Sequence, residues 1–312
     1  MIRTAIAGAD TPLAGELIRI LVNHDECELV ALASPSQAGL PASKVHHGLL
    51  GILDMNFVGS LLSLEQSPDL IFIVSDAISS ENAVEKFRKE GARIIDLSPE
   101  GYSTFPDGER CLGLSEMYRK RMVRGETACL VPRSVETAAL ISLYPLAANL
   151  LLNGSLSLSL KINQELLREL DITKSCEVIK ASLSGVQNSF VNDIEIATDT
   201  SARNRRCLRL EALLDCSLSL PDVHKLYDAI YDDHSFTFVG FEDYGFEEVQ
   251  GTNRILISLQ KPTDRKLKVE AVMDARLRGG AGEAVHAMNL LFGLYEMTGL
   301  KFKPSSFTRL ED

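Results

Sequence analysis

The sequence predicts an α/β protein of two domains, a doubly wound parallel sheet with helices on both faces and a mixed α+β domain with an open sheet. Three observations support this prediction. The chain has 312 residues, which is long for one hydrophobic core. Its first half alternates short apolar runs with helical patterns, as βαβ units do. Its second half contains strands in which apolar and polar residues alternate.

The first domain begins with a strand, a helix and a strand. Ile2–Ala7 and Glu28–Ala33 are short runs rich in strand formers, and Pro12–Val22 between them has apolar residues at helical spacing. Further buried strands are expected at Leu70–Val74, Arg93–Ile95 and Cys129–Val131. Further helices are expected at Glu81–Glu90 and Val135–Leu151, the second of them largely apolar.

The second domain begins where Ser155–Ile162 alternates leucine with serine, the pattern of a sheet with one covered face. Pro221–Tyr231 is expected to be a helix that starts on proline. Additional strands are expected at Arg205–Leu218, Phe236–Val239, Arg254–Leu259 and Leu267–Met273.

A terminal helix is expected at Ala281–Met297, with an apolar stripe that packs on the first domain. The stripe consists of Val285, Met288, Phe292 and Tyr295. We therefore expect a first domain of residues 1–146, completed by 280–312, and a second domain of residues 147–279.

Composition excludes several classes of function. A net charge of −11 argues against nucleic acid or an anionic membrane as partner, although local donors can still bind a small anion or nucleotide. The six cysteines have no C-x-x-C spacing, and the adjacent His46 and His47 are a weak arrangement for a metal, so no metal site is predicted. With no leader and no apolar run of membrane-spanning length, we expect a cytoplasmic protein.

The loop after the first strand has the position of a dinucleotide site but few of its glycines. Gly8 fits the first glycine and Ala14 the last small residue of the pattern. Thr11 stands where the middle glycine lets a backbone approach pyrophosphate, and Asp10 adds a negative charge beside it. The alternative interpretation is an ordinary strand-to-helix turn capped by Asp10 or Thr11.

Three stretches resemble the N-acetyl-gamma-glutamyl-phosphate reductase family, which is related to the aspartate-semialdehyde dehydrogenases. They are Gly15–Arg19 with Val30–Ser34, Ile94–Ser98 with Gly113–Glu116, and, most specifically, Arg278–Leu294. The resemblance covers most of the chain and weakens between residues 185 and 205. It implies a Rossmann-type first domain, NADPH as cofactor, and a reaction in which a cysteine thiolate attacks an acyl phosphate while a histidine handles protons.

The catalytic pattern of the family is not retained. Its N-P-G-C-Y-P-T stretch corresponds to residues 131–137, with Ser134 at the cysteine position. A serine hydroxyl is protonated at neutral pH and needs a base, and its other interpretation is a helix N-cap. The family's histidine segment corresponds to residues 184–203, which contain no histidine. The T-P-H-G turn becomes Ser75–Ile78, and no arginine follows Asp96–Ser98.

These departures leave three hypotheses. The first is a catalytically silent paralogue that keeps fold and oligomer interface and binds a nucleotide or modulates a reductase partner. The second is a working reductase with another nucleophile, although Cys129 and Cys207 are better explained as core residues. The third is an oxidoreductase that transfers hydride directly.

The resemblance also implies cofactor contacts and assembly. The candidate cofactor residues are Gly8, Asp10, Thr11, Pro12, Leu13, Ser34, Ser36, Ser75 and Asn289. Asn289 resembles a terminal-helix residue that faces the nicotinamide, and Ser34 and Ser36 resemble positions that contact the adenosine ribose or its phosphate. The retained terminal helix favours residual NADP binding, whereas Thr11 and Asp10 are expected to weaken or abolish it. A homo-oligomer is expected, built through the sheet of the second domain.

Overall fold

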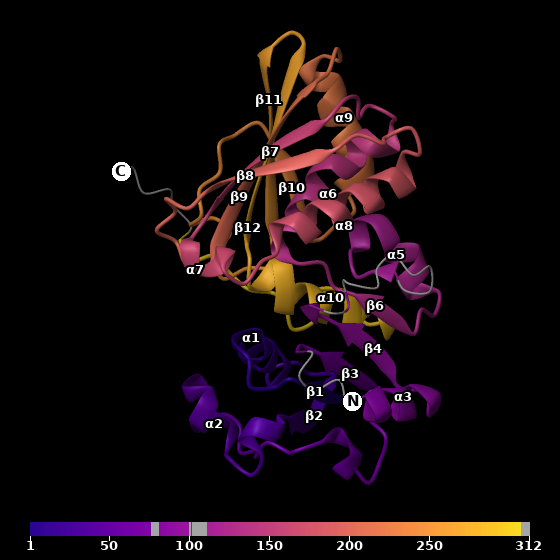
Figure 1. Ribbon diagram of the computed structural model, residues 1–312, viewed down its shortest axis with the longest axis vertical. Helices are drawn as coiled ribbons and strands as arrows, with labels where there is room; N and C mark the ends of the chain where they lie inside the picture. Colours follow the sequence, from indigo (N-terminus) through magenta and orange to yellow (C-terminus); the bar gives the residue numbers. More distant parts are fainter. Residues whose placement is uncertain (76–80, 100, 102–110, 307–312) are drawn as a thin grey trace. The chain divides into compact units, whose positions relative to one another are not determined.

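A computed structural model describes residues 1–75, 81–99, 101 and 111–306 of the chain (Figure 1). The chain forms two compact units. Unit 1 consists of Met1–Val131 and Gly280–Lys301, and unit 2 consists of Pro132–Gly279 and Phe302–Asp312. No helix in the described ranges combines the length and the apolar character needed to cross a bilayer.

Unit 1 is built on a parallel sheet of six strands in the order β2-β1-β3-β4-β6-β5. The strands are β1 (Ile2–Ala7), β2 (Cys27–Ala33), β3 (Leu70–Ile73), β4 (Arg93–Asp96), β5 (Cys111–Leu112) and β6 (Ala128–Leu130). Its described helices are α1 (Pro12–Leu21), α2 (Ala42–Val45), α3 (Glu81–Lys89), α5 (Ser115–Val123) and α10 (Gly282–Leu291). β1, β3 and β4 are buried almost continuously, as in parallel sheets that are covered on both faces. The predicted doubly wound domain is confirmed.

Unit 2 contains a mixed sheet in the order β10-β11-β12-β9-β7-β8. The strands are β7 (Leu156–Ile162), β8 (Ile194–Asp199), β9 (Cys207–Asp215), β10 (Thr237–Gly240), β11 (Ile255–Thr263) and β12 (Lys266–Asp274). The helices are α6 (Ser134–Ala148), α7 (Gln164–Leu167), α8 (Ile172–Val186) and α9 (Leu220–Tyr231). Strand β7 buries its leucines and exposes Ser157 and Ser159, as its alternation predicts. Within unit 2, α6, α8 and α9 contact the sheet (Figure 1).

The boundary between the units differs from the predicted one. The predicted first domain extends to residue 146 and so includes most of helix α6, but in the structure this helix belongs to unit 2. It packs on α8, β9 and β12, and it is buried over nearly its whole length. An apolar helix without a polar face fits equally well on either side of a domain boundary, so its sequence could not decide between them.

The terminal helix is shorter than predicted. It was expected to continue to Met297, but α10 ends at Leu291. Gly293 has φ +67°, its N–H donates to Leu290 O at 3.2 Å, and the N–H of Leu294 donates to Asn289 O at 2.8 Å, which is a Schellman C-cap. The predicted stripe therefore breaks, and its last residue, Tyr295, is 59% exposed.

Candidate functional site

The loop between β1 and α1 makes the tight turn that its first glycine predicts. Gly8 has φ +81°, and a Cβ added there would lie 2.6 Å from Ser75 Cβ, so only glycine fits. The N–H groups of Gly8 and Ala9 both donate to Ala33 O, at 3.1 and 3.0 Å. The structure thus gathers the ends of β1, β2 and β3 here, the edge at which doubly wound sheets bind ligands.

Thr11 is the N-cap of α1. Its Oγ1 accepts a hydrogen bond from Ala14 N at 3.2 Å and donates one to Gly8 O at 3.2 Å. Of the two caps that the sequence allowed, the residue that caps is Thr11 and not Asp10. The side chain expected to intrude near a phosphate is instead turned into the helix terminus.

Few backbone donors remain for an anion at this terminus. Pro12 has no N–H, and the N–H of Ala14 is bonded to the cap. The N–H groups of Asp10 and Leu13 make no hydrogen bond within the described ranges. Two amides, rather than the fuller set of a glycine-rich loop, are therefore available to a pyrophosphate.

Asp10 turns toward the end of β2. Ser36 Oγ donates a hydrogen bond to Asp10 Oδ2 at 2.9 Å, and the hydroxyls of Ser36 and Ser34 lie 3.1 Å apart. Gln37 Nε2 donates to Ser36 Oγ at 3.4 Å. Ser34 is fully buried, whereas Ser36 is exposed. The structure therefore brings these three predicted cofactor residues together, with a carboxylate among them.

His46 contacts the backbone of the β1–α1 loop, a role that the sequence did not reveal. Its Nε2 lies 2.7 Å from Ala9 O, within hydrogen-bond distance. A Cβ added at Gly15 would lie 2.7 Å from His46 Nδ1, so the glycine makes room for the imidazole. The loop geometry therefore depends on a residue that follows α2 in sequence.

Asn289 is not placed to contact a cofactor. Its side chain is fully buried in unit 1, where its Oδ1 lies 2.9 Å from His24 Nε2. Its Nδ2 donates to Glu296 O at 3.0 Å and to Thr298 O at 2.8 Å. His24 follows the C-terminal end of α1, about 15 Å along this helix from the loop at its start. The predicted nicotinamide contact is therefore corrected to a core hydrogen-bond hub.

Ser134 begins α6 in unit 2 and is 5% exposed. The N-cap is Arg133, so the alternative interpretation of Ser134 as the cap is wrong. A Cβ added at Gly279 would lie 2.4 Å from both Cα and Cβ of Ser134 and 2.7 Å from Met273 Cε. The backbone of Gly279 is therefore packed directly against the residue at the nucleophile position.

Glu136 and the histidines of unit 2 have partners other than Ser134. Glu136 is 1% exposed, and its Oε1 accepts a hydrogen bond from Ser175 Oγ of α8 at 2.9 Å. Burial raises the pKa of Glu136. The two histidines of unit 2 lie beside aspartates, with His224 Nδ1 2.8 Å from Asp228 and His234 Nε2 3.7 Å from Asp233.

The six cysteines are free thiols, and five of them lie in environments that disfavour the thiolate. Burial raises the pKa of Cys111 to about 12, and it raises the pKa of Cys129 and Cys207 as well. The pKa values of Cys27 and Cys176 are raised for the same reason. Cys129 and Cys207 are fully buried, in agreement with their interpretation as core residues.

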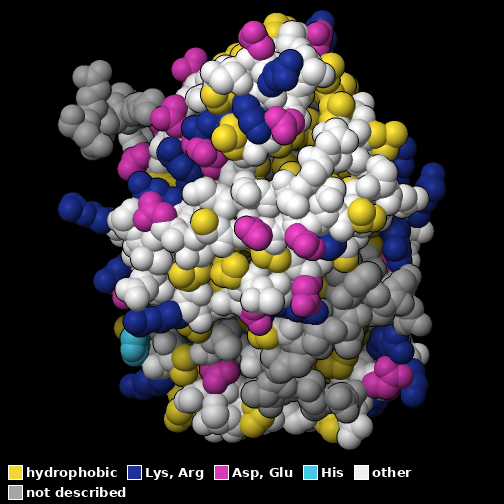
Figure 2. Space-filling model, turned by 45° about the horizontal axis from the view of Figure 1, so that its top comes forward, with side chains coloured by type: hydrophobic (Ala, Val, Ile, Leu, Met, Phe, Trp, Pro, Cys, Tyr) yellow, Lys and Arg dark blue, Asp and Glu magenta, His cyan; other side chains and the backbone are white. Residues whose placement is uncertain are grey.

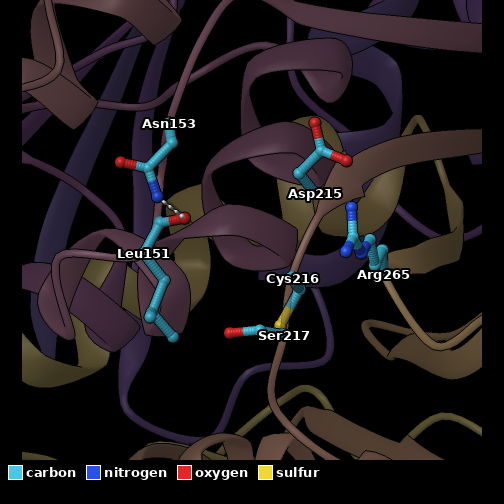
Figure 3. A pocket seen from close by; sticks show the side chains of 6 residues that line it. All are labelled: Leu151, Asn153, Asp215, Cys216, Ser217 and Arg265. Carbon is cyan, nitrogen blue, oxygen red and sulfur yellow. Dashed lines mark hydrogen bonds between the residues drawn. The ribbon is translucent and has the colours of Figure 1, made fainter.

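A pocket of about 470 Å³ in unit 2 lies apart from the predicted site residues. It is lined by Leu151, Asn153, Asp215, Cys216, Ser217 and Arg265. Figure 3 shows Asp215 and Arg265 on one side of it and Leu151 with Asn153 on the other. In the part of the chain that the structure describes, no three His, Cys, Asp or Glu side chains form a group suited to a metal ion. Residues 76–78 of the Ser75–Ile78 turn, and residues 100 and 102, lie outside the described ranges.

Comparison with known proteins identifies the family. Residues 3–124 match the model of the semialdehyde dehydrogenase NAD-binding domain. The chain is 34% identical to the N-acetyl-gamma-glutamyl-phosphate reductase of Parabacteroides distasonis, over 98% of this chain and 100% of the relative. It is 31% identical to the reductase of the same name from Bacteroides thetaiotaomicron, with the same coverage.

Solved structures agree on the fold. Aspartate semialdehyde dehydrogenase II from Vibrio cholerae superposes with a TM-score of 0.69 at 12% identity, over 95% of this chain and 99% of that one. The NADP complex of aspartate semialdehyde dehydrogenase from Candida albicans has a TM-score of 0.69 at 12% identity, over 94% and 98%. The relatives, at 34% and 31% identity over nearly the whole of this chain, show that it belongs to the N-acetyl-gamma-glutamyl-phosphate reductase family.

Proposed function

We propose that this chain does not reduce N-acetyl-gamma-glutamyl phosphate and acts instead by binding a nucleotide in unit 1. The observation that carries the proposal is the environment of Ser134, which stands where the family pattern has its cysteine. Ser134 is 5% exposed, the backbone of Gly279 packs against its Cα and Cβ, and its hydroxyl makes no hydrogen bond within the described part of unit 2. An unactivated hydroxyl is a poor nucleophile.

Glu136 does not supply the missing base. Residues two apart on a helix do not face each other, so Glu136 points away from Ser134. Its bond to Ser175 shows that it faces α8. His224 and His234 are associated with α9, whose Tyr227 and Tyr231 donate hydrogen bonds to Ser142 O and Ile141 O, about two turns along α6 from Ser134.

Another thiol is a poor substitute for the lost cysteine. Five of the six cysteines have pKa values raised by burial, whereas a catalytic thiol needs its pKa lowered. These shifts oppose the alternative of a working reductase with a replaced nucleophile. Direct hydride transfer would also need a proton donor, and the family's histidine segment, which would supply one, is not retained, so we do not favour that alternative either.

Retained nucleotide binding is supported by unit 1. It matches a family of NAD-binding domains, and its loop keeps the Gly8 turn and the unbonded amides of Asp10 and Leu13. Over the face drawn in Figure 2, basic and acidic side chains are interspersed, and the net charge is −11. Both features favour a small ligand rather than nucleic acid.

We further propose that the protein is cytoplasmic and homo-oligomeric, or pairs with a reductase paralogue. Six free thiols suit a reducing compartment. The face of the unit 2 sheet that exposes Ser157 and Ser159 is a candidate interface. Sedimentation equilibrium of the chain alone, and of the chain mixed with a reductase paralogue, tests the assembly. A monomer at micromolar concentration in both samples would contradict it.

The reaction is tested in the oxidative direction, with N-acetylglutamate semialdehyde, phosphate and either NADP or NAD, by the absorbance of the reduced nucleotide. The reductase of Parabacteroides distasonis is the positive control, and Ser134→Cys is the matched variant. We expect no turnover from the wild type or the variant, because the variant regains the thiol but not the base. Turnover by the wild type would refute the proposal. Turnover by Ser134→Cys alone would show that the replacement of cysteine by serine is the main cause of the lost activity.

A further inference from the structure

The carboxylate of Asp10 is bonded to Ser36, just after β2, where doubly wound domains select between nucleotides. In such domains an acidic residue after the second strand binds the ribose 2′-hydroxyl of NAD, whereas an arginine nearby accommodates the 2′-phosphate of NADP. In this chain β2 ends at Ala33, and residues 34–41 contain no Asp, Glu, Lys or Arg. The segment itself therefore supplies neither the acid nor the cation.

The loop supplies the acid instead. Asp10 reaches the end of β2 through the 2.9 Å hydrogen bond from Ser36 Oγ, which lies 3.1 Å from Ser34 Oγ. Asp10 Oδ1 makes no hydrogen bond within the described ranges, so it can accept one from a ribose hydroxyl. The Ser36 bond ties the carboxylate to the segment after β2, and the amides of Asp10 and Leu13 remain available to a pyrophosphate.

We propose that unit 1 selects a dinucleotide with free ribose hydroxyls, NAD, over NADP, and that Asp10 is the residue that makes this choice. The inference rests on the nucleotide binding in the proposed function and departs from the NADPH preference that the family implies. The residues fit an unphosphorylated ribose and do not fit a 2′-phosphate. That phosphate would place a second negative group beside Asp10, where like charges repel even at the dielectric constant of water.

Isothermal titration of the full chain with NAD and with NADP tests the proposal without any acyl substrate. We expect NAD to bind at least about tenfold more tightly, because even in water the repulsion between a carboxylate and a doubly charged phosphate close to it is worth about a factor of ten or more in affinity. Asp10→Asn, which keeps an acceptor but removes the charge, should bring the two affinities close together. Asp25→Asn is the control, since Asp25 is exposed and precedes β2 at the other end of that strand.

Ser36→Ala is the second variant, because it releases the carboxylate without changing the charge of the loop. We expect it to reduce the preference for NAD while thermal unfolding stays close to that of the wild type. Equal or tighter binding of NADP, an unchanged ratio in Asp10→Asn, or no binding of either nucleotide at millimolar concentration would each overturn the proposal. Because turnover plays no part in this titration, its failure is separate from a failure of the proposed catalytic silence.

Discussion

Replacing Asn289 with alanine should destabilise unit 1 without altering nucleotide affinity. The side chain makes three hydrogen bonds, of which those to His24 and Glu296 O are buried and that to Thr298 O is partly buried. Each contributes about 1 kcal/mol, and the partners left unsatisfied add a further penalty, so a loss of about 3–5 kcal/mol is expected. For a unit of this size that loss corresponds to a fall in Tm of about 10 °C.

The measurement is thermal unfolding followed by circular dichroism, with nucleotide titration of the same sample below its transition. Asn23→Ala is the matched control, because Asn23 is exposed and makes one bond of 3.3 Å to Arg19 O. Its effect should stay within about 0.5 kcal/mol. His24→Ala combined with Asn289→Ala should cost less than the two single changes added together, because both remove the same bond. If Asn289→Ala left Tm unchanged but weakened nucleotide binding, the assignment of Asn289 to the core would be refuted.

Three further changes test the loop and α6. Glu136→Gln should stabilise the protein increasingly as the pH rises above about 4.5, the ordinary glutamate pKa, since the raised folded-state pKa makes the wild type lose stability as this group ionises. Urea unfolding at pH 4 and pH 8 measures the difference, and a pH-independent difference would contradict it. Gly279→Ala should cost about 1–3 kcal/mol or more in the same assay, because the new methyl group would overlap Ser134; a neutral effect would mean that the backbone is not packed there. Thr11→Ala should cost about 1 kcal/mol through loss of the helix cap, which thermal unfolding detects; an unchanged Tm would remove Thr11 from that role.

Local pattern determined most of the fold. The period-2 alternation of β7 and the apolar run of β1 can be read in the sequence itself, and both segments form the predicted strands. Where the prediction failed, the deciding signal was tertiary or a single residue. α8 and β8 were not predicted. The buried stripe of α8 includes Ser175 and Ser182, which weaken its apolar pattern, and Ser175 is bonded to Glu136 of α6. The end of α10 depends on Gly293, whose positive φ overrides a helical pattern that continues to residue 297.

The site was predictable in location but not in its contacts. The Gly8 turn follows from the loop pattern, since no other residue accepts that backbone near Ser75. The cap formed by Thr11 and the bond from Ser36 to Asp10 depend on side-chain directions that spacing does not specify. The predicted nicotinamide contact of Asn289 failed because a polar residue on a terminal helix can equally well bind a ligand or form a hydrogen bond in the core. Its partner His24 lies 265 positions away in the sequence.

Catalytic silence is tested most directly by a single-turnover experiment. The chain, in excess over NADP or NAD, is mixed with N-acetylglutamate semialdehyde and phosphate, and reduced nucleotide is followed for hours. A slow enzyme would still convert one equivalent, so the experiment separates slow catalysis from none. We predict no reduced nucleotide above a blank without protein. Formation of one equivalent of reduced nucleotide would contradict it and would require a nucleophile and a base that this structure does not offer at Ser134.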